Sequence, residues 1–107
     1  MSNFNLVDKV ENITKKEFKE IQLTEELQKK YIGKYQLAPE FFITITQEGK
    51  RLYGQPTGQG KFELFPYEDD KFFLKVVDAQ VKFNTENGII IGLTLFQNGK
   101  TDGKKIE

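Results

Sequence analysis

The chain contains no histidine, no cysteine and no tryptophan, and its single serine is Ser2. Without cysteine it can form neither a disulfide bond nor a thiolate nucleophile. Without histidine, a Ser or Thr nucleophile would have to use a lysine or a carboxylate as its base. Thr44, Thr46 and Thr94 lie in strand-like segments without a catalytic motif, as is usual for threonine in β-structure. We therefore predict no catalytic residues and expect that the chain is not an enzyme.

Two further segments could suggest a metal site, a pair of catalytic carboxylates or a phosphate-binding loop, but neither has the required residue spacing. Glu68-Asp69-Asp70 lacks the alternating ligand spacing of a calcium loop, and acidic residues crowded in this way are typical of a solvated turn. A carboxylate pair drawn from these residues and Glu63 could in principle serve glycoside hydrolysis, but the same crowding favours the turn. The loop from Gly54 to Gly60, followed by Lys61, lacks the residue spacing of a phosphate-binding loop. We predict no metal and no cofactor.

Charge and hydropathy exclude two classes of partner. Sixteen Lys and Arg balance sixteen Asp and Glu, so no net positive field attracts nucleic acid. No run approaches the roughly 20 apolar residues of a membrane-spanning helix. The first residues, Met1 to Leu6, lack the basic start and apolar stretch of a signal peptide, so we expect the chain to stay where it is made. The compartment itself is left open.

The rest of the sequence is typical of an all-β fold. Ten Phe and four Tyr fall almost entirely in short alternating segments separated by turn signals, among them Asn87-Gly88 and Asn98-Gly99. The segments are residues 31–37, 41–48, 51–53, 61–66, 71–77, 80–84, 89–97 and 101–106. Short connections favour eight antiparallel strands in up-and-down order that close into a barrel. The side chains expected inside are Tyr31, Tyr35, Ile43, Ile45, Leu52, Leu64, Leu74, Val81, Phe83, Ile91, Leu93 and Leu95.

The first 30 residues have a different character, because they are rich in Lys and Glu and contain no Gly or Pro. Residues 14–17 have the spacing of a capping box, and Phe18 and Ile21 follow on one face of a helix. Thr24 is the expected N-cap of a second short helix over residues 24–30, which should pack on the barrel through Leu27. We predict a helical or linker segment over residues 1–23 and a barrel domain over residues 24–107.

Several stretches together resemble a known family. They are 27–35, 42–45, 51–55, 58–59, 62–66, 72–73, 81–83 and 92–99, and as an ordered set the chain resembles a lipocalin-like domain of unknown function. That domain is found at the C-terminus of β-lactamase-related serine hydrolases. The resemblance implies an eight-stranded lipocalin-like barrel without activity of its own, which serves a hydrolase in assembly, in covering its active site or in handling substrate. Such parents are often periplasmic or secreted. The Ser-x-x-Lys motif of the hydrolases is absent here, since Asn5 stands three residues after Ser2.

Two functional hypotheses follow. The first is an accessory or interaction domain whose partners are an upstream or separate serine-hydrolase domain and a second copy of itself. The alternative is a carrier for a small apolar ligand, because an eight-stranded barrel is either filled by its side chains or wide enough for one such molecule. For partner or substrate contact we predict a rim formed by Arg51, Tyr53, Gln55, Gly58 and Gln59, since Arg and Tyr often dominate interface energy. Tyr35 offers a hydroxyl from inside the barrel and should belong mainly to the core.

Overall fold

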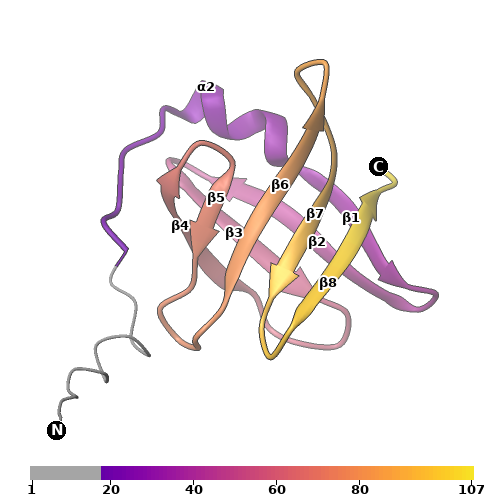
Figure 1. Ribbon diagram of the computed structural model, residues 1–107. Helices are drawn as coiled ribbons and strands as arrows, with labels where there is room; N and C mark the ends of the chain where they lie inside the picture. The colour runs from indigo at the N-terminus through magenta and orange to yellow at the C-terminus, as the bar shows by residue number, and fades with distance from the viewer. Residues whose placement is uncertain (1–17) are drawn as a thin grey trace, which may run out of the picture.

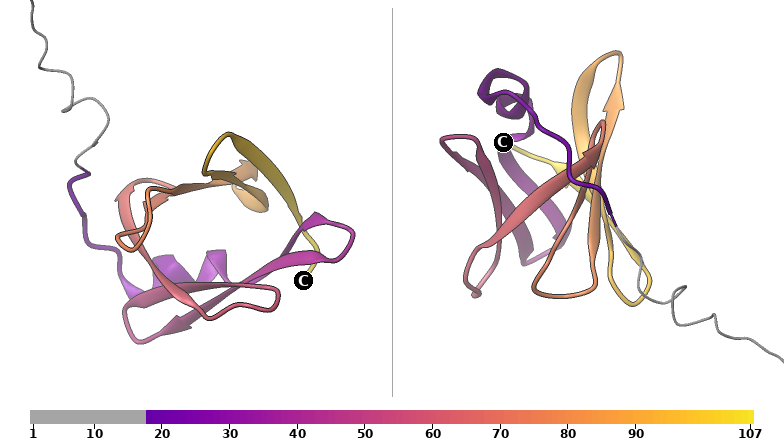
Figure 2. Two further views of the ribbon diagram at one scale, coloured as in Figure 1. Left: turned by 90° about the horizontal axis from the view of Figure 1, so that it is seen from below. Right: turned by 90° about the vertical axis from the view of Figure 1, so that its left-hand side faces the viewer.

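The computed structural model describes residues 18–107, and these residues form a closed antiparallel barrel (Figure 1). Every strand pairs with its neighbour in the chain, and β1 pairs with β8 to close the ring, as predicted. Figure 2 shows the strands from below, arranged around a common interior. The strands are β1 (Gly33–Ala38), β2 (Phe41–Glu48), β3 (Arg51–Pro56), β4 (Phe62–Glu68), β5 (Lys71–Phe73), β6 (Gln80–Glu86), β7 (Ile89–Phe96) and β8 (Lys100–Lys105).

The two Asn-Gly turns connect the strands that the sequence indicated. Asn87 and Gly88 have φ angles of 54° and 80°, and Asn98 and Gly99 have 53° and 119°. Glycine and asparagine tolerate this left-handed region best, which is why such pairs favour tight hairpins. The pairing of β6 with β7 and of β7 with β8 is therefore favoured by the turn residues between them.

Two glycines lie where β8 comes close to its neighbours β7 and β1. A Cβ atom on Gly92 would collide with the carbonyl oxygen of Gly103, and one on Gly103 would lie 2.8 Å from Cδ1 of Leu37. Beyond β8, the amide of Ile106 donates to the Lys34 carbonyl at 2.8 Å and extends the contact with β1. Glycine at these two positions lets the last strand reach the first.

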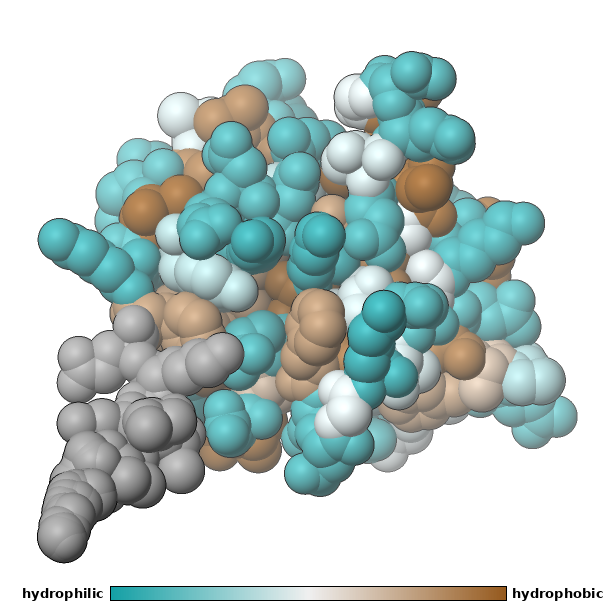
Figure 3. All heavy atoms as spheres, viewed as in Figure 1, coloured by the Kyte–Doolittle hydropathy of each residue, from teal (hydrophilic) through white to brown (hydrophobic). Residues whose placement is uncertain are grey.

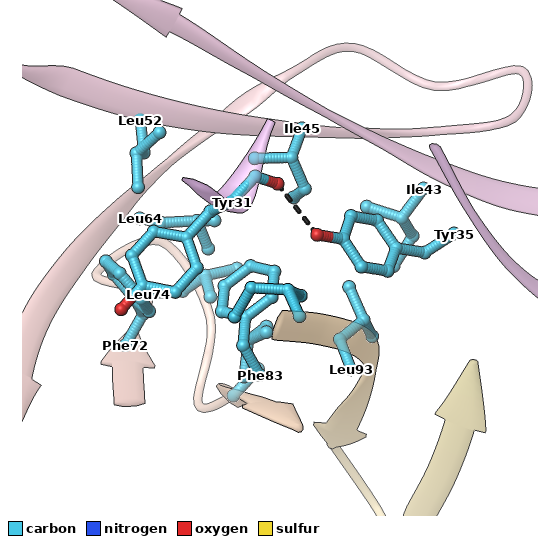
Figure 4. Close-up of a cluster of buried hydrophobic side chains, with 13 residues drawn as sticks. Tyr31, Tyr35, Ile43, Ile45, Leu52, Leu64, Phe72, Leu74, Phe83 and Leu93 are labelled. Carbon is cyan, nitrogen blue, oxygen red and sulfur yellow. Dashed lines mark hydrogen bonds between the residues drawn. The ribbon is translucent and has the colours of Figure 1, made fainter. Parts of the chain in front are cut away.

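Aromatic rings occupy the middle of the core (Figure 4). The Phe83 ring centroid lies 4.6 Å from that of Tyr31, and 5.5 Å from those of Tyr35 and Phe72. These side chains are at most 2% exposed. The buried apolar set is Tyr31, Tyr35, Ile43, Ile45, Leu52, Leu64, Phe72, Phe73, Leu74, Ala79, Val81, Phe83, Ile90 and Leu93, with Leu95 packed against it. Most of the predicted interior is thus confirmed.

Ile91 is the exception among the predicted interior residues, because it is 44% exposed. The register between β6 and β7 shifts at this point: Asn84 faces Gly92, whereas Thr85 faces Ile90. Ile91 is the extra residue of a β-bulge, which breaks the alternation of sides along the strand. As a result Ile90 points into the core and Ile91 points outward.

The strand predicted over residues 71–77 is shorter than expected. β5 ends at Phe73, and the chain bends through residues 75–78. The Leu74 amide still donates to the Ala79 carbonyl at 3.0 Å, so the bend is closed by a backbone hydrogen bond. Leu74 remains buried, whereas Val76 and Val77 are exposed.

One helix precedes the barrel in the described part of the chain, and its orientation differs from the prediction. α2 (Glu25–Gln28) continues into the 3-10 turn η1 (Lys29–Tyr31), and Thr24 caps it by accepting a hydrogen bond from the Leu27 amide at 3.1 Å. Leu27 is 50% exposed, so the predicted packing through this residue is wrong. Gln28 is buried instead, and its Nε2 donates to the Lys50 carbonyl at 2.8 Å. The helix contacts the barrel through a hydrogen-bonded polar side chain.

The segment before this helix has no regular secondary structure. Phe18 and Ile21 do not lie on a helical face as predicted, because residues 18–24 form no helix. The capping box at residues 14–17 lies outside the described residues. Within residues 18–107 no helix has the length and apolar character needed to cross a membrane.

Candidate functional site

Three of the predicted site residues form a row on the outer face of β3. Arg51, Tyr53 and Gln55 alternate with Leu52, Gly54 and Pro56, all of which are buried. At about 3.3 Å per residue the row is roughly 13 Å long. The predicted outward orientation of this face is confirmed.

Charged side chains surround Tyr53, the single aromatic residue of the row. Arg51 Nε lies 3.8 Å from Glu63 Oε2, and Lys61 Nζ lies 4.7 Å from the centre of the Tyr53 ring. Lys61 also pairs with Glu48. A hydrogen bond with Tyr53 and the charge of Glu63 raise the pKa of Arg51. Exposed ion pairs of this kind contribute little to folding stability, so these groups can exchange partners at small cost.

The loop after β3 brings the remaining rim residues together. Gln55 Nε2 donates to the Gln59 carbonyl at 2.9 Å, and the Gln59 amide donates to the Pro56 carbonyl at 3.1 Å. Gly58 has a φ angle of 75° and supplies the left-handed residue of this turn. Gln55, Gly58 and Gln59 are exposed, and they lie at the end of β3 that is farthest from Arg51.

Tyr35 does not belong to this surface. It is fully buried, and its hydroxyl donates to the Tyr31 carbonyl at 2.8 Å. The Tyr31 hydroxyl in turn donates to Asp70 Oδ1 at 2.7 Å. Burial raises the pKa of both tyrosines, and the Asp70 carboxylate raises that of Tyr31 further. Tyr35 is a core residue, as predicted, and Asp70 has a structural partner.

Thr94, one of the threonines considered for catalysis, also has structural partners. Thr94 is buried, accepts a hydrogen bond from Asn84 Nδ2 at 3.1 Å and donates to Asp102 Oδ1 at 2.6 Å. These contacts tie β6, β7 and β8 together on the outer face. Among residues 18–107, no three His, Cys, Asp or Glu side chains are grouped as a metal site would require.

The structure adds one contact surface that the sequence interpretation missed. The Phe18 ring lies 4.4 Å from the Tyr67 ring and 5.1 Å from the Phe73 ring, measured between centroids. The Ile21 amide donates to the Pro66 carbonyl at 2.9 Å, and Glu20 pairs with Lys75 at 3.5 Å. Residues 18–23 therefore pack on the outside of β4 and β5, and we call them the connector. The signal in the sequence was a set of outward aromatic residues on these two strands.

The geometry defines the class of protein: a small, closed, up-and-down β-barrel domain that carries a polar row on the outside of β3 and a connector packed on β4 and β5. Residues 9–107 match the family model described as domain of unknown function DUF3471. The chain belongs to this family.

The chain is also similar to part of one characterised protein. The chain is 30% identical over 73 residues to Penicillin-binding protein 4* of Bacillus subtilis (strain 168). The match covers 68% of this chain and 16% of the relative, so the chain spans about one sixth of that protein's length. No solved structure matches. The comparison links the barrel to a region of a much longer penicillin-binding protein.

Proposed function

We propose that the chain is a non-catalytic accessory domain that works with a β-lactamase-related serine hydrolase. The observation that carries the proposal is the extent of the match to the Bacillus relative. The similarity covers 68% of this chain but only 16% of that protein, as expected if the chain corresponds to one module of a larger enzyme. In this proposal the hydrolase supplies the chemistry and the barrel supplies contacts.

The surface row on β3 is the proposed contact region for the hydrolase. It presents one half-buried tyrosine among side chains of both charges, and Arg51 is exposed. Tyr and Arg are enriched among the residues that dominate interface energy. The neighbouring loop is exposed, and the hydrogen bond from Gln55 to Gln59 holds its conformation, so it can add to the contact region.

The alternative hypothesis, a ligand inside the barrel, gains no support from the packing. Tyr31, Tyr35, Phe72 and Phe83 fill the centre with rings whose centroids are 4.6 to 5.5 Å apart. An apolar ligand would have to displace these rings, and close-packed interiors resist that change.

A chimera tests the accessory role. In one variant of the Bacillus relative the matched segment is deleted, and in a second it is replaced by residues 18–107 of this chain. Both are labelled with a fluorescent penicillin. We expect the deletion to lose labelling and the chimera to restore part of it.

A double substitution in the chimera, Arg51→Ala with Tyr53→Ala, should remove the restored labelling, whereas Lys100→Ala on exposed β8 should not. The isolated chain should not turn over a chromogenic cephalosporin or ester. Full labelling of the deletion variant, or turnover by the purified chain, would overturn the accessory role.

A further inference from the structure

A groove lies on the outside of the barrel, on a different face from the row on β3. It is lined by Tyr67, Lys71, Gln80, Val81, Lys82 and Phe96, and its volume is about 340 Å³. This volume lies at the small end of the range for ligand pockets in proteins. Elsewhere the visible surface is mixed, with brown apolar spheres scattered among teal hydrophilic ones (Figure 3).

Two irregularities of the sheet adjoin the groove. β5 has only three residues, so it connects β4 and β6 over a short length. The register of β4 with β5 shifts between Pro66 and Glu68, which makes Tyr67 the extra residue of a bulge. Tyr67 keeps the outward side that alternation along β4 gives it, and its ring forms one wall of the groove.

The Tyr67 ring packs against two other aromatic rings, which restrict its position. It lies 4.4 Å from the Phe18 ring of the connector and 6.1 Å from the Phe73 ring, measured between centroids. Burial raises the pKa of its hydroxyl further above physiological pH, where tyrosine is neutral in any case. Phe96 is half-buried and lines the groove as the second aromatic residue. The two rings lie at opposite edges of the groove, on β4 and β7, and each offers an apolar face to a flat or branched group.

The charges in the groove are unbalanced. Lys71 and Lys82 are direct cross-strand partners on β5 and β6, and like charges in this position destabilise a sheet. Glu68 Oε1 lies 3.0 Å from Lys71 Nζ and offsets one of the two charges. Lys82 makes no ion pair with any residue between 18 and 107. The groove therefore carries about one uncompensated positive charge.

The remaining polar group is the side chain of Gln80, which faces Phe96 across the ladder. It is half-buried, and its amide has no side-chain hydrogen bond within the described part of the chain. A primary amide both donates and accepts hydrogen bonds. It can therefore pair with a peptide-like group on a bound molecule.

From these observations we propose that the groove binds a small monocarboxylate that carries an aromatic or branched apolar group. The carboxylate lies between Lys71 and Lys82, the apolar group packs on Phe96, and the neighbouring Gln80 pairs with an amide of the ligand. A single negative charge matches the single uncompensated lysine. A phosphate dianion fits less well, because the lining contains neither an arginine fork nor a helix N-terminus. The proposal is independent of the accessory role, which involves the row on β3.

The test is a titration of the full chain with N-acetyl-L-phenylalanine, followed by the backbone amide signals in nuclear magnetic resonance spectra. We expect saturable shifts at residues 80–82 and at Phe96. The matched uncharged probe is N-acetyl-L-phenylalaninamide, and the matched probe without a ring is N-acetylglycine. Both should bind more weakly than N-acetyl-L-phenylalanine. Inorganic phosphate serves as the competing anion and should bind most weakly.

Variants assign the binding to these side chains. Lys82→Gln should weaken binding by about two- to fivefold, the range measured for exposed ion pairs, and Phe96→Leu by about two- to tenfold. Lys100→Gln, on exposed β8 outside the groove, should bind like the parent chain. Thermal melting confirms that each variant is folded.

Four results would overturn the proposal. They are shifts that fail to saturate, equal binding of N-acetyl-L-phenylalanine and N-acetyl-L-phenylalaninamide, unchanged binding by folded Lys82→Gln, and a preference for phosphate.

Discussion

The substitution Tyr35→Phe measures what one buried hydroxyl contributes to this barrel. The hydroxyl is fully buried and donates to the Tyr31 carbonyl at 2.8 Å. Its removal deletes a hydrogen bond and leaves that carbonyl without the donor. Such a change costs about 1–3 kcal/mol of unfolding free energy, because a buried acceptor is left unsatisfied. The ring itself is retained, so packing against Phe83 changes little.

The same variant has a second, pH-dependent signature. An unfolded tyrosine loses its proton at a pKa of about 10, and burial raises the pKa of both Tyr31 and Tyr35 in the folded barrel. Above pH 10 the unfolded state therefore binds fewer protons than the folded state, and stability falls as pH rises. Each such tyrosine contributes a slope of about 1.4 kcal/mol per pH unit, and below pH 9 the contribution is constant. Tyr35→Phe removes one of the two contributions.

Urea unfolding followed by circular dichroism, at pH 7 and in steps to about pH 11, provides the assay. The variant should be less stable at pH 7 and should lose stability less steeply above pH 10 than the parent chain. Lysines titrate in the same range, but they are common to both proteins and cancel in the comparison. Tyr53→Phe on the half-exposed row is the control and should change stability at pH 7 by less than about 0.5 kcal/mol. Equal alkaline slopes, or an unchanged stability at pH 7, would refute the reasoning.

Three further predictions concern closure, the connector and the helix. Gly92→Ala should destabilise the barrel by about 3 kcal/mol or more, because its Cβ would collide with backbone on β8, whereas Gly60→Ala has open space and should be tolerated in urea unfolding. Phe18→Ala should release the connector, seen as faster proteolysis within residues 18–23 while the barrel stays intact; an unchanged cleavage rate would contradict the ring contacts. Gln28→Ala should lower the unfolding free energy by about 1–3 kcal/mol, because the Lys50 carbonyl loses its donor, and a neutral effect in urea unfolding would show that water replaces it.

The surface row shows how far the sequence predicts a site. Arg51, Tyr53 and Gln55 are spaced by two residues, so any strand places them on one face. Their ionic partners depend on register between strands: Glu63 is opposite Tyr53 on β4, and Lys61 reaches the ring from the loop. The groove depends on tertiary structure even more, because its lining comes from β4, β5, β6 and β7. No local pattern places Lys71 beside Lys82.

The sequence by itself determined the strands and the hairpins, because alternation and Asn-Gly turns act within a few residues. It also determined most of the core, since the side-chain period of a strand is two. Only the tertiary structure decided where that period breaks. Ile91 has no partner on β6, and this bulge turns Ile91 outward and Ile90 inward, against the simple alternation. The burial of Gln28 was decided in the same way, since its hydrogen-bond partner at Lys50 is 22 residues away in the chain.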